Sequence, residues 1–415
     1  MTKVYIETYG CTLNQADSDI IRALLREKYE VVDSEEESDV VVLNTCTVKG
    51  PTENKILSRI ASIDRKLVVA GCMAVNERKI RKSAPLAPIV GPSSLKSIVQ
   101  AVSDALQGTP NIYQTAAGKD DLPKTLNAPI MRIPINEGCV SACSFCQTKL
   151  ARPSLRSYRP RTVMDWIEKS VKNGAREIQL TSMDSGAYGR DIQTNLIHLL
   201  DSIARMEGDF LVRLGMINPD HAKEMLPDII HILENPKFYK FLHILVQTGS
   251  EKVCREMNRD HTVNDYVDIV EQVRARIPEA TIATDIIVGY PTETEEDFGQ
   301  TLRLLEQTQP DITNLSKFSP RPGTKAKELK GLPSDEVKRR SRATSVLVKK
   351  IHEQRRRALI GNDYMVLITE RDRDFKGRNI NYQQVVVKDY QGNLGGSVEV
   401  KIVDANNTSL FGKMI

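Results

Sequence analysis

Short apolar runs alternate with longer amphipathic stretches along the first hundred residues. The strand-like runs are 4–9, 39–44, 67–70 and 88–90. The stretches with apolar residues at helical spacing are 15–27, 53–63 and 94–106. Alternating strands and helices are typical of a parallel sheet with right-handed crossovers. We therefore predict an α/β domain with an open parallel sheet over residues 1–108.

The middle of the chain repeats a strand–helix unit six times. A stretch rich in Thr, Ala, Gly, Asp and Pro comes first and predicts a linker at 109–129. The expected strands that follow are 131–135, 177–180, 210–214, 243–247, 281–288 and 312–318. Six such units predict a partial (β/α)6 barrel over 130–333. Its active site should open at the carboxyl ends of the strands.

The last part of the chain changes from a helical to an alternating pattern. Residues 334–360 read as a basic connecting helix. Strand-like runs at 364–369, 384–388 and 398–402 then alternate with turns rich in Gly, Asn and Asp. This pattern predicts a small β-barrel over 361–415.

Composition excludes several classes of protein. The chain has 415 residues, enough for two or three domains, and no apolar stretch approaches the length of a membrane span. Its start, Met1 to Ile6, runs straight into a strand, so we expect no signal peptide and a cytoplasmic location. Seven scattered cysteines are too few for a disulfide scaffold and are better interpreted as metal ligands in a reducing compartment.

Positive charge is concentrated near the C-terminus. Residues 338–378 contain 13 Lys and Arg against 5 Asp and Glu, whereas the whole chain carries only +4. A basic segment on a mildly acidic body favours a nucleic-acid partner. A solvated charged helix is the alternative.

Three cysteines follow the first barrel strand at the spacing C-x-x-x-C-x-x-C. They are Cys139, Cys143 and Cys146. Three thiolates in so tight a loop can hold one corner of an iron–sulfur cube. No fourth Cys follows at ferredoxin spacing, so one iron would stay open for a substrate or cofactor. A structural zinc site is the alternative, but it requires four protein ligands and no nearby Cys or His completes the set.

The other cysteines of the first domain share one topological position. Cys11, Cys46 and Cys72 each lie just past the end of a predicted strand. Carboxyl ends of parallel strands meet at one sheet edge, and Gly10 and Gly71 would allow the backbone to approach a bulky group. Three ordinary buried cysteines are the alternative. We predict a second three-thiolate cluster here, whereas Cys254, in a predicted helix without another thiol nearby, is expected to be a small buried side chain.

These motifs resemble two known families. The loop, with Phe145 before its last Cys, is similar to the signature of the radical S-adenosylmethionine (SAM) superfamily. Residues 9–14, 44–48 and 70–72 resemble the N-terminal domain of the tRNA methylthiotransferases, in the archaeal and eukaryotic form of the threonylcarbamoyladenosine branch. The match covers nearly the whole chain.

The resemblance implies two 4Fe-4S clusters and SAM as cofactors. The open iron at the Cys139 loop would chelate SAM, and one electron would cleave it to a carbon radical. The second cluster would carry the methylated sulfur, and a second SAM would supply the methyl group. The implied SAM-contacting residues are Phe145, Asp184, Gln247, Ser250 and Arg259.

Some of these positions leave alternatives open. For Gln247 and Arg259 the alternatives are a structural hydrogen bond and a surface charge. Three residues depart from the family pattern: Met183 replaces an acidic or amide residue, and Pro153 and Thr292 each replace a common Gly. The Met183 departure leaves a side-chain contact to SAM from this strand end in question.

The resemblance also implies the partners. The C-terminal barrel resembles the TRAM domain of RNA-modifying enzymes, so tRNA is the expected partner. The residues expected to meet its phosphates are Arg355, Arg356, Arg371, Arg373, Lys376 and Arg378. Such contacts position an RNA without reading its sequence. A flavodoxin- or ferredoxin-type electron donor and a monomeric chain are further expectations.

The implied reaction is methylthiolation of carbon two of the adenine in N6-threonylcarbamoyladenosine, next to the tRNA anticodon. Two alternatives remain. One is the same chemistry on isopentenyladenosine in tRNA or on an aspartate of a ribosomal protein. The other is a non-catalytic iron–sulfur protein that binds RNA.

Overall fold

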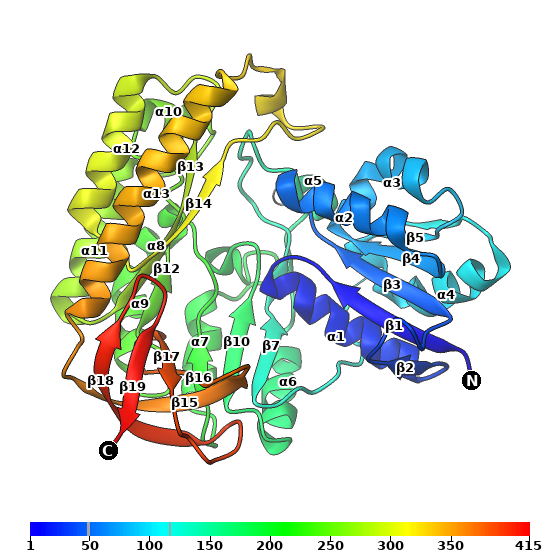
Figure 1. Cartoon of the computed structure of the whole chain (residues 1–415), viewed down its shortest axis with the longest axis horizontal. Coiled ribbons are helices and arrows are strands. Elements are labelled where there is room, and N and C mark those ends of the chain that lie inside the picture. The colour runs from blue at the N-terminus through cyan, green and yellow to red at the C-terminus, as the bar shows by residue number, and fades with distance from the viewer. Residues whose placement is uncertain (48–49, 116–117) are drawn as a thin grey trace.

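The computed structural model describes residues 1–47, 50–115 and 118–415 (Figure 1). It contains a parallel α/β domain, a partial α/β barrel and a small closed β-barrel, in that order along the chain. The fold class predicted from the sequence is confirmed. Within the described residues, no helix is long and apolar enough to cross a membrane.

The first domain is built on a six-stranded sheet in the order β2-β1-β3-β4-β5-β6, with every neighbouring pair parallel. Its strands are β1 (Lys3–Thr8), β2 (Glu30–Val32), β3 (Val40–Thr45), β4 (Lys66–Gly71), β5 (Ile89–Val90) and β6 (Ile112–Tyr113). Its helices are α1 (Thr12–Arg26), α2 (Gly50–Ser62), α3 (Glu77–Ser83) and α4 (Ile98–Gln107). All of β3 is buried, as expected for a central strand with both faces covered.

The edges of this sheet differ from the prediction. Strand β6 lies inside the stretch 109–129 that was expected to be only a linker, and it pairs with β5. Tyr113 anchors it, because its hydroxyl bonds Asp104 of α4 and its carbonyl accepts from Gly91 N at 2.7 Å. Strand β2 was also missed. Strands of two or three residues at a sheet edge are too short to produce a recognisable alternation.

The central barrel consists of two three-stranded parallel sheets, β7-β10-β11 and β12-β13-β14. A bridge between Ile217 and Ile244 connects them. The strands are β7 (Ile130–Pro134), β10 (Glu177–Thr181), β11 (Leu211–Arg213), β12 (Phe241–His243), β13 (Thr281–Val288) and β14 (Ile312–Lys317). The helices are α5 (Thr148–Ala151), α6 (Pro160–Lys172), α7 (Leu196–Ala204), α8 (Pro219–Glu224), α9 (Leu226–Glu234), α10 (Glu251–Glu256), α11 (Val263–Arg276) and α12 (Glu295–Thr308).

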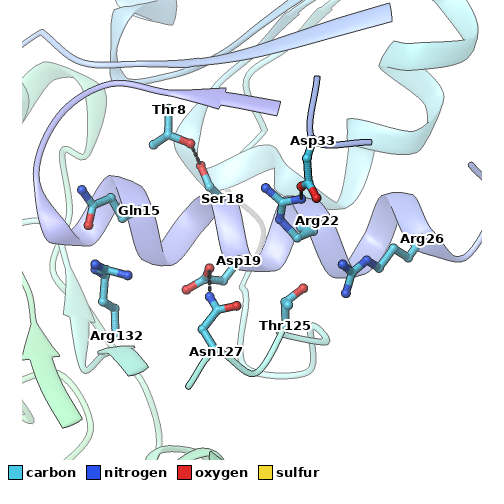
Figure 2. A pocket seen from close by; sticks show the side chains of 10 residues that line it. All are labelled: Thr8, Gln15, Ser18, Asp19, Arg22, Arg26, Asp33, Thr125, Asn127 and Arg132. Carbon is cyan, nitrogen blue, oxygen red and sulfur yellow. Dashed lines mark hydrogen bonds and ion pairs between the residues drawn. The ribbon is translucent and has the colours of Figure 1, made fainter. Parts of the chain in front are cut away.

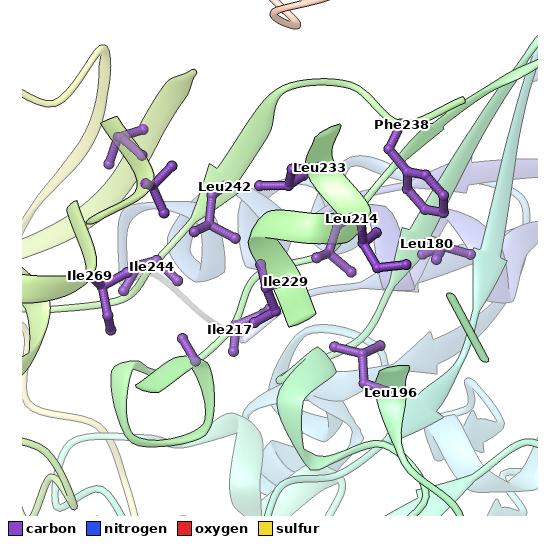
Figure 3. Close-up of a cluster of buried hydrophobic side chains, with 14 of the residues drawn as sticks. Leu180, Leu196, Leu214, Ile217, Ile229, Leu233, Phe238, Leu242, Ile244 and Ile269 are labelled. Carbon is purple, nitrogen blue, oxygen red and sulfur yellow. The ribbon is translucent and has the colours of Figure 1, made fainter. Parts of the chain in front are cut away.

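The main core lies between the barrel strands and their covering helices. Figure 3 shows Leu180 and Leu242 from the strands close to Leu196 and Ile229 from the helices. Strand β12 begins two residues earlier than predicted. Residues 241–246 are buried throughout, so the apolar pattern gives no period that could place the strand.

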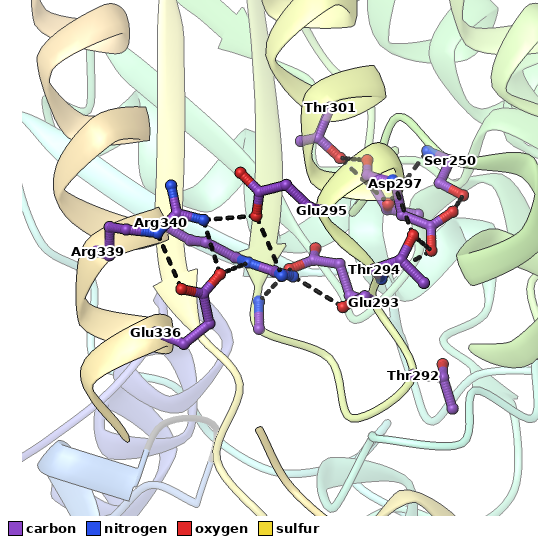
Figure 4. Close-up of polar contacts among 12 residues, drawn as sticks. Ser250, Thr292, Glu293, Thr294, Glu295, Asp297, Thr301, Glu336, Arg339 and Arg340 are labelled. Atoms are coloured by element: carbon purple, nitrogen blue, oxygen red, sulfur yellow. Dashed lines mark hydrogen bonds and ion pairs between the residues drawn. The ribbon is translucent and has the colours of Figure 1, made fainter. Parts of the chain in front are cut away.

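Helix α13 (Ser334–Arg357) packs against β14 and α12 and leads to the C-terminal barrel. Figure 4 shows its Arg340 bonded to Glu293, with 2.7 Å between Nη1 and Oε2. The barrel closes in the order β15-β16-β17-β19-β18. Its strands are β15 (Asp363–Arg371), β16 (Phe375–Arg378), β17 (Gln384–Val387), β18 (Ser397–Ala405) and β19 (Leu410–Met414). Strands β16 and β19 were not predicted, since each is short and mixes apolar with charged residues.

The turn at 379–383 joins the two barrels. It lies under the amino ends of β12 and β13, where Lys240 N donates to Ile380 O at 2.8 Å and Gln383 Nε2 donates to Thr281 Oγ1 at 2.8 Å. Tyr382 packs on Tyr239 and Phe241, with ring centroids 4.8 and 4.9 Å apart. The C-terminal barrel thus forms the floor of the central barrel.

Candidate active site

The loop that carries Cys139, Cys143 and Cys146 is pinched at its base. The short strands β8 (Asn136–Glu137) and β9 (Arg156–Ser157) pair antiparallel on either side of it. Gly138 follows β8 with φ +70°, and a Cβ atom there would overlap the carbonyl oxygen of Ser154. Only glycine fits this position. The close pairing of β8 and β9 therefore keeps the three thiols in one compact loop at the carboxyl end of β7.

The segment Met257–Arg259 forms hydrogen bonds to the same loop from the opposite side of the barrel. Met257 O accepts from Ser144 N at 2.9 Å, and Asn258 Nδ2 donates to Ala142 O at 3.0 Å. Arg259 Nη1 lies 3.2 Å from Cys143 Sγ. A guanidinium this close to the sulfur would balance the negative charge of a thiolate–iron site.

The loop thiols are suited to a cluster rather than to free nucleophiles. Burial, with a contribution from the neighbouring Cys143, raises the pKa of the Cys146 thiol to about 11. Burial likewise raises the pKa of Cys139. Both thiols therefore hold their protons without iron, and binding of iron must release them.

The three thiols of the first domain come together as expected. A Cβ atom on Gly10 would lie 2.7 Å from Cys46 Cβ and 2.9 Å from Cys46 Sγ, so the loops after β1 and β3 touch. Asn14 binds the same loops through Tyr9 O at 2.7 Å and Thr45 O at 3.0 Å, and its Oδ1 lies 3.9 Å from Cys72 Sγ. One asparagine thus joins all three strand ends.

These thiols differ in exposure. Cys46 and Cys72 are buried and Cys11 is exposed. Burial raises the pKa of the Cys72 thiol, and the guanidinium of Arg152 beside it opposes that rise. The buried Nε of Arg152 has no hydrogen-bond partner within the described residues. A cationic donor of this kind next to a thiol suits a sulfur-rich, negatively charged cluster.

In the part of the chain that the structure describes, no three His, Cys, Asp or Glu side chains are close enough to hold a single metal ion. Such closeness is what a zinc site requires. In an iron–sulfur cube each thiolate binds a different iron, so its ligands are further apart.

Asp184 and Ser250 are buried, and their side chains bond neighbouring residues. Asp184 is 0% exposed, and its carboxylate accepts from Gly186 N, Asn218 N, Asn218 Nδ2 and His221 Nδ1 at 2.7 to 3.2 Å. Ser250 is also 0% exposed and bonds Asp297 at 2.6 Å while capping α10 (Figure 4). Both side chains hold loops that border the site, and their contact with SAM stays a prediction.

The other predicted contacts border the mouth of the barrel. Phe145 is partly buried against Val253 and Tyr290, and Arg259 also binds Asn218 Oδ1 and Leu245 O at 2.7 Å. Gln247 follows β12 with φ +69°. A non-glycine residue in this left-handed region is strained, and such strain is concentrated at functional sites.

The first domain sits on the mouth of the barrel. Thr12, next to Cys11, bonds Thr181 at the carboxyl end of β10, with 2.8 Å between the hydroxyl oxygens. Thr47, next to Cys46, bonds Gln147, next to Cys146, at 2.5 Å. Residues adjacent to cysteines of both groups are thus in direct contact, so the two groups of thiols lie at one junction between the first domain and the barrel.

Sequence reasoning missed the charged cluster beneath these contacts. Arg152 is 2% exposed and pairs with Asp17 of α1 and Glu137 of β8, and Lys119 pairs with the same two carboxylates. Asp17 lies three and four residues before the apolar Ile20 and Ile21. A carboxylate on the apolar face of a predicted helix was a usable signal. No comparable signal marks Arg152.

The basic residues predicted to bind RNA are not equivalent. Arg371 and Arg373 are exposed, and Lys376 pairs with Asp372 at 2.5 Å. Arg356 is 5% exposed and donates to Asn407 O at 3.0 Å, so this prediction is corrected to a structural role. The other two also have partners: Arg355 bonds Asp311 at 2.8 Å, and Arg378 stacks 5.2 Å from the Tyr382 ring centroid.

Three family models match consecutive parts of the chain. Residues 3–91 match the uncharacterized protein family UPF0004, residues 133–305 match the radical SAM superfamily, and residues 357–415 match the TRAM domain. Among solved structures, the radical SAM methyltransferase TsrM of Kitasatospora setae superposes with a TM-score of 0.58 at 14% identity, over 79% of this chain and 75% of that one. This likeness concerns the fold.

Curated relatives match over the full length. The probable threonylcarbamoyladenosine tRNA methylthiotransferase of Pyrococcus horikoshii is 40% identical, with 100% of both chains covered. Its counterpart in Archaeoglobus fulgidus is 41% identical over 99% of this chain and 98% of that one. The threonylcarbamoyladenosine tRNA methylthiotransferase of Drosophila melanogaster is 35% identical over 100% of this chain and 78% of its own.

Proposed function

The chain belongs to the threonylcarbamoyladenosine tRNA methylthiotransferases, and from this premise we propose that it adds a methylthio group to carbon two of N6-threonylcarbamoyladenosine next to the tRNA anticodon. The observation that supports the proposal is the contact between Thr12 and Thr181, which brings the strand ends that carry the two groups of three cysteines to one junction. The reaction needs a radical and a sulfur donor at the same carbon atom. The two groups of cysteines that would hold their sources must therefore lie close together.

The residues fit the two cofactor sites. Cys139, Cys143 and Cys146 would hold the 4Fe-4S cluster that binds SAM. The second cluster would be held by the first-domain thiols, which are Cys11, Cys46 and Cys72. When bound, these groups supply one-electron cleavage of SAM and a transferable sulfur, chemistry that side chains cannot provide.

The chain's own residues position and enclose the reaction. Arg259 holds Cys143 through a guanidinium contact and orders Asn218 and the Leu245 carbonyl. Phe145 and Gln247 are proposed SAM contacts at the rim of the barrel. The buried pairing of Arg152 with Asp17 and Glu137 keeps the first domain on the mouth of the barrel.

The exposed basic residues of the TRAM domain are the proposed tRNA contacts. Arg371 and Arg373 have guanidinium groups in solvent, and Lys376 lies on the neighbouring strand. A loop base such as that next to the anticodon can be splayed into a pocket without melting a duplex.

Three finer points complete the proposal. A flavodoxin- or ferredoxin-type protein would supply electrons. The chain would act as a monomer, because one copy supplies both groups of thiols and the barrel. A cytoplasmic location is supported by the described cysteines, all seven of which lack disulfide bonds.

An anaerobic turnover tests the function. Reconstituted protein, SAM and a strong reductant are mixed with one tRNA in two forms, with and without the threonylcarbamoyl group, and the digested nucleosides are weighed by mass spectrometry. We expect a methylthio mass gain only on the modified form and none with Cys143→Ala. A gain on isopentenyladenosine instead would refute the proposed acceptor.

A further inference from the structure

Two arginines flank a glutamine in one row across the barrel. Gln179 of β10 is in register with Arg132 of β7 on one side and with Arg213 of β11 on the other. Neighbouring strands lie about 4.8 Å apart, so the three side chains leave one sheet face close together. The alternate residues Ile133, Leu180 and Val212 pack under the outer helices, so the row faces the barrel interior.

Neither arginine of this row is neutralised. Within the described residues, Arg132 and Arg213 make no ion pair and no side-chain hydrogen bond, and the Nε atom of each is buried without a partner. Arg213 has only the ring of Phe241, 5.1 Å from its guanidinium carbon. Burial lowers the pKa of Arg213, which nearby Tyr382 and Glu177 do not fully offset.

The nearest carboxylate is already in use. Glu177 lies one row below, and its oxygens accept from Gln179 Nε2 at 2.6 Å, Tyr239 OH at 3.0 Å and Tyr382 OH at 3.3 Å. The buried arginines Arg152 and Arg340, by contrast, have carboxylate partners, which are Asp17 and Glu293. Arg132 and Arg213 are half-buried, and a partly desolvated cation without a counterion is costly, so the row suits an anion that arrives from outside.

The row is within reach of the site. Gln179 lies two residues before Thr181 at the barrel mouth, a depth of about 6.6 Å. A cavity of about 340 Å³ adjoins Arg132. Figure 2 shows Arg132 beneath the helix that carries Gln15 and Arg22. Of the three residues in the row, Arg132 lines this cavity, which lies beside the first domain.

We propose that Arg132 and Arg213 form a recognition site for an anionic group of the acceptor, the carboxylate at the end of its threonylcarbamoyl arm. The proposal rests on the proposed function and names what selects its substrate. The arm, a urea joined to one amino acid, spans about 7 Å, close to the depth of the row below the mouth.

The chemistry of the row favours a carboxylate over an apolar arm. A guanidinium donates two parallel hydrogen bonds to a carboxylate, and a charged hydrogen bond in a dry site is stronger than a neutral one. An isopentenyl arm would bury both cations without a partner. The row would therefore reject it, since a recognition site with an unmatched polar group loses affinity steeply.

Binding measurements with one tRNA in three forms test the proposal. The forms carry adenosine, threonylcarbamoyladenosine or isopentenyladenosine at the target position, and Kd is measured anaerobically on reconstituted protein with SAM. The variants are Arg213→Gln and Arg132→Gln, with Arg213→Lys as the charge-preserving variant. Arg303→Gln, an exposed position on α12, is the matched control. Thermal unfolding confirms that each variant is folded.

We expect each Gln variant to bind the threonylcarbamoyl form about 10- to 100-fold more weakly and to bind the other two forms as the wild type does. Arg213→Lys should retain part of the affinity, and Arg303→Gln should retain all of it. An equal loss on all three forms would identify an RNA phosphate as the anion and would overturn the proposal. Unchanged discrimination in both Gln variants would overturn it too.

The proposed function has a separate readout. If the wild type adds no methylthio group to the threonylcarbamoyl form, the proposed function fails. If it does, while the Gln variants still discriminate between the forms, only the recognition site fails.

Discussion

Arg152 forms a buried ion pair with Asp17 of α1, with 2.5 Å between Nη2 and Oδ2. It lies six residues after Cys146, the last cysteine of the loop that carries Cys139, Cys143 and Cys146. The same guanidinium lies beside Cys72 and 3.0 Å from Glu137, two residues before Cys139. One side chain therefore contacts the thiol group of the first domain, helix α1 and the base of the loop that carries Cys139. The two groups of thiols are therefore linked through a cluster of buried charges.

Replacing one partner of this pair should destabilise the protein strongly. Asp17→Asn leaves Arg152 and Lys119 buried with only Glu137 to balance them. Breaking a buried pair costs about 3 to 5 kcal/mol, which urea denaturation would measure. Asp33→Asn, at a fully exposed carboxylate, is the control. A loss below about 1 kcal/mol would show that the cluster does not hold the domains together.

Replacing one cysteine of the first-domain group should separate SAM cleavage from thiolation. We expect Cys11→Ala to keep SAM cleavage and lose thiolation, with iron falling from about eight to about four per chain. Anaerobic iron analysis and release of 5′-deoxyadenosine measure the two effects. Cys254→Ala is the matched control, since that thiol is buried alone and bonds His261 O at 3.3 Å. Loss of both activities in a folded Cys11 variant would contradict this division.

The pair of Asp184 and His221 should make stability depend on pH. Burial opposes protonation of the ring, but the hydrogen bond that the ring donates to Asp184 and the charge of that carboxylate raise the pKa of His221 above 6.5. A raised pKa stabilises the folded state fully below pH 6.5, and this contribution is lost as pH rises through the folded pKa. His221→Gln should therefore lose most stability at pH 6 and less at pH 8, by urea denaturation. The exposed His198→Gln is the control, and a deficit that grows with pH would be the opposite result.

Patterns in the sequence predicted the strands and thiols that follow simple periodicity. The runs before Cys11, Cys46 and Cys72 alternate with helices, so topology alone predicted that the three thiols meet. Contacts across domains leave no such trace. Asp184 and Ser250 lie in motifs near the site, and only the fold shows that their oxygens are turned inward to backbone and side-chain donors.

The basic residues show the same limit. Arg355, Arg356 and Arg357 are consecutive in the sequence, yet a helix points them in three directions. Arg356 is buried, Arg355 binds Asp311 and Arg357 pairs with Glu353. The net charge of a segment shows how basic it is. It does not show which guanidinium groups are exposed and without an ion-pair partner.

Substitutions at Tyr382 test whether the C-terminal barrel also stabilises the central barrel. Its ring packs on Tyr239 and Phe241, and its hydroxyl bonds Gln179 at 3.0 Å. Tyr382→Ala should cost about 2 to 4 kcal/mol by urea denaturation, because the ring leaves a cavity under the central barrel. Tyr382→Phe should cost about 1 kcal/mol, the value of its hydrogen bonds.

Amide exchange localises the effect. The Lys240 amide bonds Ile380 O across the two barrels, so it should exchange faster in Tyr382→Ala. Tyr390→Ala is the matched control, since that ring packs on Phe375 within the C-terminal barrel alone. If the Lys240 amide stays protected in Tyr382→Ala, the remaining bonds of Asn381 and Gln383 hold the floor without the ring. The two barrels would then be joined by polar contacts rather than by aromatic packing.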